Sequence, residues 1–161
     1  MKGEAVLYEL LTKLQSMEEN QLFMATAVTM ATVYKNSVSL TDYSTCKKVL
    51  RILVETLSAN LSSPLNKKVL YAINIIITNK PELGRFFIQE NGVSLLEQFI
   101  LGSDKDLKRK SLDIYSHLLQ MFIDEPRLAT SNICSQTLLD LTAAENREEY
   151  PLVQSYLELL K

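Results

Sequence analysis

Apolar residues recur at spacings of three and four along most of the chain, which is the pattern of helices that bury one face and not of strands. Turn-forming residues separate the runs. The pattern predicts helices over 7–14, 21–35, 42–57, 65–79, 81–90, 93–101, 104–122, 133–143 and 151–160. The run VLYAINIII at 69–77 could be read as a buried strand, but its length and the Ala72 inside it favour a nearly encircled helix.

The breaks between these helices carry residues that stop or cap a helix. Serines and Pro64 separate the third and fourth helices, and Asp104 is expected to cap the helix that follows it. The pair Asn91-Gly92 is expected to close the helix at 81–90, with Gly92 in the left-handed conformation that ends many helices. Gly102 is expected to cap the next helix.

The chain also overlays itself at a shift of about 43 residues. Leu70 and Ile73 precede Leu112 and Tyr115 by 42 positions, and Ala27 precedes Leu70 by 43. Helical repeats of this length occur in armadillo and HEAT proteins, whose stacked units share one core. We therefore predict an all-α, armadillo/HEAT-like right-handed solenoid. It forms a single repeat domain over 1–161, with repeats at 1–60, 61–102 and 103–144 and a terminal helix at 150–160. We expect it to be a fragment of a longer chain.

Composition narrows the class of function. The 161 residues include only four glycines and four prolines, too few for the turns of a many-stranded fold. The net charge of -2 offers no electrostatic footprint for nucleic acid, and no apolar run is long enough to span a membrane. A protein partner is the expected ligand.

Few side chains suggest chemistry. His117 is the only histidine, and with Asp113 four residues before it could form an acid–base pair, but a polar contact edge is the simpler interpretation. We expect no enzymatic activity, cofactor or metal. Cys46 and Cys134 are expected to be packed thiols, although the sequence leaves open whether they are free. Asn60 lies in an Asn-Leu-Ser sequon and is a candidate glycosylation site if the chain enters the secretory pathway.

Lysine and arginine gather near the starts of several predicted helices, where they oppose the helix dipole. These positions predict a rim that meets an acidic protein partner, with an ordinary solvated surface as the alternative. The basic residues are Lys47, Lys48, Arg51, Lys67, Lys68, Lys105, Lys108, Arg109 and Lys110.

The Asn91-Gly92-Val93 turn followed by LLEQFI resembles the signature of an armadillo unit. In that family, the long helices, here 21–35, 65–79 and 104–122, line a concave face. Nuclear-import adaptors of the family carry tryptophan and asparagine there. This chain instead has Tyr71 with Ile75, and Asp113 with His117, so a basic extended peptide is not the ligand we expect.

Four stretches carry a more specific resemblance: ATAVTMATVYKNS, KKVLRILVETL, PLNKKVLYAINIII and RFFIQENGVSLLEQFI. They resemble the armadillo-type nucleotide exchange factors of seventy-kilodalton heat-shock chaperones, most of all the endoplasmic-reticulum members that serve BiP. The resemblance implies a co-chaperone in the endoplasmic-reticulum lumen, or alternatively the cytoplasm, that binds the ATPase domain and promotes ADP release. The alternative function is an armadillo scaffold without effect on an ATPase. The candidate partner-binding residues are Lys67, Lys68, Tyr71, Asn74, Lys110, Asp113, His117 and Gln120.

Overall fold

The computed structural model describes residues 6, 8–13, 20–36, 43–60, 62–122 and 124–129. Within these ranges the secondary structure is helical and contains no strand. The all-α prediction is therefore confirmed for the described part of the chain. The chain divides into two compact units, 1–90 and 91–161, and each is described separately below. The repeat boundaries stay a prediction.

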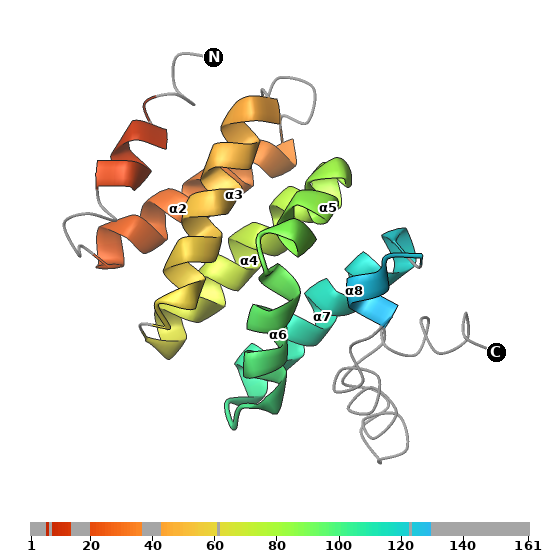
Figure 1. Cartoon of the computed structure of the whole chain (residues 1–161). Coiled ribbons are helices and arrows are strands. Elements are labelled where there is room, and N and C mark those ends of the chain that lie inside the picture. Colours follow the sequence, from red (N-terminus) through yellow and green to blue (C-terminus); the bar gives the residue numbers. More distant parts are fainter. Residues whose placement is uncertain are drawn as a thin grey trace. The chain divides into compact units, whose positions relative to one another are not determined.

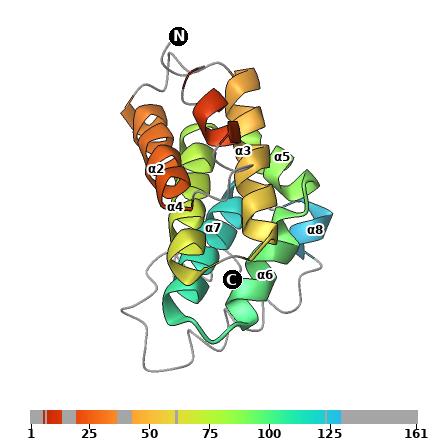
Figure 2. The same ribbon diagram turned by 90° about the vertical axis from the view of Figure 1, so that its left-hand side faces the viewer.

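The first unit contains a helical segment at 8–13 and four longer helices (Figure 1). The longer helices are α2 (Asn20–Asn36), α3 (Tyr43–Ser58), α4 (Ser63–Asn79) and α5 (Glu82–Gln89). Helix α2 lies alongside α4, which is the most extensive helix contact of the unit, and α3 packs on both α4 and α5 (Figure 2). Helix α4 is thus the central element of this unit.

The run VLYAINIII lies inside α4, as the helical interpretation requires. Its side chains are buried on most sides because α2, α3 and α5 all pack against this helix. The completely or almost completely buried residues of α4 are Leu65, Asn66, Val69, Leu70, Ala72, Ile73, Ile76 and Ile77. On α3 the predicted stripe of Cys46, Val49, Leu50, Leu53 and Leu57 is also buried. The packed state predicted for Cys46 is confirmed, because this side chain is completely buried.

Pro64 belongs to the start of α4 and not only to the break before it. The helix begins at Ser63, two residues earlier than predicted, with Ser62 in an extended conformation and Pro64 in the first turn. Proline is well tolerated there because the first N–H groups of a helix have no partner within the helix.

The expected conformation of the Asn91-Gly92 turn is wrong. Asn91 takes the left-handed conformation, with φ 67° and ψ 19°, and no described glycine has a positive φ. Gly92 is instead the first residue of α6 and is buried. Asparagine tolerates the left-handed region better than most residues. Gly102 is the C-cap of α6, as predicted, in an extended conformation with φ -68°.

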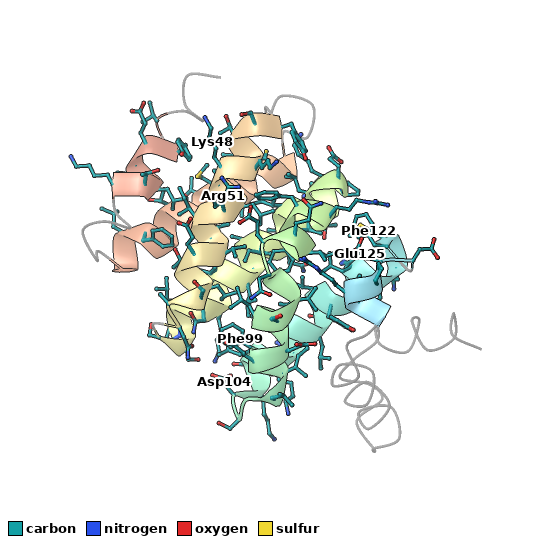
Figure 3. The ribbon with its side chains drawn as sticks, viewed as in Figure 1. Lys48, Arg51, Phe99, Asp104, Phe122 and Glu125 are labelled. Atoms are coloured by element: carbon teal, nitrogen blue, oxygen red, sulfur yellow. The ribbon has the colours of Figure 1, made fainter. Side chains whose placement is uncertain are left out.

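The second unit contains α6 (Gly92–Leu101), α7 (Lys105–Met121) and the short α8 (Pro126–Ala129), which was not predicted. Helix α6 packs on α7. Asp104 caps α7 as predicted: its Oδ1 accepts hydrogen bonds from the N–H groups of Asp106 at 3.0 Å and Leu107 at 3.1 Å (Figure 3). The buried Tyr115 hydroxyl donates to the Leu128 carbonyl at 3.1 Å, which fastens α8 to α7.

Threonines of α2 bond to their own helix. The hydroxyls of Thr26, Thr29 and Thr32 each donate to the carbonyl four residues earlier, at 2.8 to 2.9 Å. Thr29 and Thr32 are exposed, and their hydroxyls bond to carbonyls of the same helix.

Some predictions lie outside the described residues. They are the helices at 133–143 and 151–160 and the packing of Cys134.

Candidate functional site

Helix α4 carries four of the predicted partner-binding residues. Tyr71 is 39% exposed although its neighbours Leu70 and Ala72 are completely buried. Lys68, three residues before Tyr71, is exposed, while Lys67 and Asn74 are half-buried. The spacing places Lys67, Lys68, Tyr71 and Asn74 along one side of the helix, because residues three and four apart are neighbours on a helix surface. These four residues are called the α4 strip below.

Asn74 has an unusual environment within the α4 strip. Its side-chain Oδ1 is buried and has no hydrogen-bond partner among the described residues. A buried carbonyl oxygen without a donor costs about 1–3 kcal/mol, so such an atom is normally paired. Tyr71, at the neighbouring turn, combines an apolar ring with a polar hydroxyl, the combination that is enriched at protein interfaces. The α4 strip can therefore bury an aromatic ring and accept a hydrogen bond from the same ligand.

Helix α7 carries the other four predicted residues, Lys110, Asp113, His117 and Gln120. Gln120 is exposed, and the other three are half-buried. They are spaced by three or four residues and so follow one side of α7. His117 Nδ1 is buried and has no hydrogen-bond partner among the described residues. These four residues are called the α7 strip.

The α7 strip contains a perturbed carboxyl group. Burial raises the pKa of Asp113, and the nearby Arg109, Lys110 and His117 act against this rise. Burial dominates because an ionised carboxylate loses hydration when it is removed from water. Asp113 and His117 are one helical turn apart, but the described structure contains no hydrogen bond between their side chains. The polar contact edge is therefore the interpretation that this geometry favours.

The sequence placed all eight residues on one binding face. Each helix does bring its own four together, as described above. The α4 strip lies in the first unit and the α7 strip in the second. A single surface made of both strips stays a prediction.

Sequence reasoning missed a cluster that joins α3 to α5. Arg51 Nη2 donates to Glu90 Oε1 at 2.7 Å, and the Arg51 guanidinium carbon lies 5.3 Å from the centre of the Phe86 ring. Lys47 Nζ is 4.5 Å from the same ring centre. The spacing of four between Lys47 and Arg51, and between Phe86 and Glu90, is visible in the sequence. No periodicity indicates that these two helix faces meet.

Asn60 is exposed and stands in a turn after α3, with φ 46°. Its side-chain Oδ1 accepts a hydrogen bond from Asn66 Nδ2 at 3.1 Å. The turn presents Asn60 at the surface, as glycosylation would require, and Leu61 of the sequon lies outside the described residues.

In the described ranges, no group of three or more histidine, cysteine, aspartate or glutamate side chains is arranged to hold a metal ion. No helix among the same residues has the length and apolar character needed to cross a membrane. Comparisons of the chain with protein-family models, curated proteins and solved structures found no match.

Proposed function

We propose that the chain is a protein-binding helical solenoid that acts as a nucleotide exchange factor for a BiP-type chaperone in the endoplasmic-reticulum lumen. The observation that carries the protein-binding part is Tyr71, a large aromatic side chain that is 39% exposed between completely buried neighbours. Aromatic residues of this kind supply much of the binding energy in protein interfaces. The resemblance to exchange factors supports the choice of partner.

The α4 strip suits a folded partner better than a small ligand. Lys68 and Lys67 add positive charge beside Tyr71, and charge of this kind orients a partner and speeds its association. The Asn74 Oδ1 supplies an acceptor that a donor from the partner can satisfy after a small rearrangement. One aromatic anchor with a polar and charged rim is the usual composition of a protein interface.

Exchange activity would follow from preference for one state of the chaperone. The factor must bind the ATPase domain more tightly when its nucleotide cleft is open than when it is closed, because equal affinity for both states shifts no population. The chain itself would contact no nucleotide. In this mechanism the α4 strip would hold one lobe of the ATPase domain in its displaced position.

Stopped-flow release of a fluorescent ADP analogue tests the proposal, with BiP and with a cytosolic homologue as substrates. We expect faster release from BiP when the chain is present. No acceleration with either chaperone would reject exchange activity and favour the scaffold alternative. Acceleration with the cytosolic chaperone alone would move the proposal to the cytoplasm.

A matched pair of variants tests the surface. Tyr71→Ala is expected to weaken chaperone binding about 30-fold, the effect of losing an interface residue worth about 2 kcal/mol. Leu101→Ala removes an exposed apolar side chain from α6, which is 61% exposed, and is expected to leave binding unchanged. Equal binding by both variants, each with unchanged helicity, would exclude Tyr71 from the interface.

A further inference from the structure

Three cations follow one another on the exposed surface of α3. Lys47, Lys48 and Arg51 are all exposed, and Figure 3 shows Lys48 and Arg51 on this helix. Lys47 and Arg51 are one helical turn apart and both lie against the Phe86 ring. Lys48 Nζ lies 5.9 Å from the centre of the Tyr8 ring. These three residues are called the α3 cation row.

The cation row is held in place although it is exposed. Surface lysines normally sample many rotamers, and fixing them on binding costs conformational entropy. Here the contacts with Phe86 and Tyr8 favour particular positions for the two ammonium groups before any ligand arrives. The ion pair with Glu90 does the same for Arg51. Part of the ordering cost is thus met when the protein folds.

The row also keeps unused hydrogen-bonding capacity. The negative face of an aromatic ring attracts an ammonium group, but most N–H groups of that ammonium remain available to oxygen acceptors. Among the described residues, neither Lys47 nor Lys48 has a carboxylate partner.

An aromatic side chain extends the row at one end. Tyr43 is 43% exposed and lies one turn before Lys47 on α3. The chain as a whole carries a net charge of -2, so a long polyanion such as nucleic acid would gain little beyond this patch. A short segment that reaches only α3 meets positive charge and an apolar ring together.

We propose that the α3 cation row and Tyr43 bind a short acidic segment of a protein partner, in which carboxylates flank an aromatic or apolar side chain. The carboxylates would accept hydrogen bonds from Lys47, Lys48 and Arg51, and the apolar side chain would pack on Tyr43. This surface lies on α3, a different helix from the one that carries the α4 strip of the proposed function. It gives the chain a second interaction site.

The probe is a fluorescein-labelled peptide that carries glutamates around one phenylalanine, with a glutamine version as its partner. Fluorescence anisotropy measures binding to the whole chain at about 50 mM and about 300 mM NaCl, a range over which screening of exposed charges increases strongly. We expect the glutamate peptide to bind at low salt, and the higher salt concentration or the glutamine version to weaken binding. Lys47→Gln with Lys48→Gln should weaken it about five- to tenfold, since two exposed ion pairs are lost.

The control removes the same charge elsewhere. Lys67→Gln with Lys68→Gln takes two positive charges from α4 and should leave peptide binding unchanged. Equal weakening by both double variants would show a non-specific charge effect and overturn the proposal. Failure of the glutamate peptide to bind would also overturn the proposal. The same holds if the chain binds vesicles that contain phosphatidylserine but does not bind the peptide.

The same variants separate the two proposals. Lys47→Gln with Lys48→Gln should leave ADP release from the chaperone as fast as with the unchanged chain. Peptide binding without any exchange activity would reject the proposed function and support the acidic-segment site. Exchange activity without peptide binding would reject the acidic-segment site and support the proposed function.

Discussion

The start of α7 offers a sharp test of the second unit. The Asp104 carboxylate accepts two backbone N–H groups, at 3.0 and 3.1 Å, and stands next to the positive end of the α7 dipole. Losing a side-chain cap costs about 1 kcal/mol, and losing a negative charge at a helix start costs about 0.5 kcal/mol. We therefore expect Asp104→Ala to lower the free energy of unfolding by about 1.5 kcal/mol. Asp104→Asn should lose only the smaller part, because its amide oxygen can still accept.

Urea denaturation followed by far-ultraviolet circular dichroism measures both changes, and the thermal midpoint should fall by about 4 °C for the alanine variant. Asp124→Ala is the control, since it removes an exposed carboxylate from the turn before α8. Equal losses for Asp104→Asn and Asp104→Ala would refute the hydrogen-bond part of the argument. An alanine variant as stable as the unchanged chain would refute the cap itself.

Three further predictions concern single residues. Asp113→Asn should raise the free energy of unfolding at neutral pH, because the raised pKa of Asp113 means that ionisation of this carboxyl disfavours the folded state. In the unchanged chain, stability is retained below the unfolded pKa of about 3.9 and is lost as the pH rises through the folded pKa. Denaturation series at several pH values should show the benefit disappear in acid, and a pH-independent benefit would contradict the role of charge. Tyr115→Phe should lower the free energy of unfolding by about 1 kcal/mol, because the Leu128 carbonyl loses its hydrogen-bond donor. Denaturant unfolding measures this change, and an unchanged midpoint would argue against the hydrogen bond. Asn91→Ala should lower the free energy of unfolding by about 1 kcal/mol, because residue 91 has a positive φ, whereas Asn91→Gly should lower it much less. Thermal melting measures both variants, and equal losses of stability would contradict the positive φ.

Local pattern accounts for much of the fold. The apolar run in α4 could be identified as a helix because its length exceeds that of a typical strand. Asp104 could be identified as a cap because aspartate before an amphipathic run has one clear role. The sequence predicts the wrong left-handed residue in the Asn91-Gly92 turn, because both residue types accept this conformation and the local sequence does not distinguish them.

In the candidate sites, too, the sequence predicts features within one helix but not contacts between helices. The spacing along α4 and α7 predicted which side chains share a side of each helix. The contact of Lys47 and Arg51 with Phe86 and Glu90 joins residues 39 positions apart, and helical periodicity carries no information about which helices meet. The unpaired Oδ1 of Asn74 could not be predicted from the sequence either, because the hydrogen-bond partners of an amide depend on tertiary packing and not on the neighbouring residues in the sequence.

The self-bonded threonines of α2 have a consequence for sequence change. Since the hydroxyls of Thr29 and Thr32 donate to carbonyls that already belong to the helical ladder, replacing these residues by valine removes no hydrogen bond between helices. The replacement keeps the shape and the methyl surface of the side chain. Positions 29 and 32 of helix α2 can therefore change between threonine and valine while the shape of the helix surface stays the same.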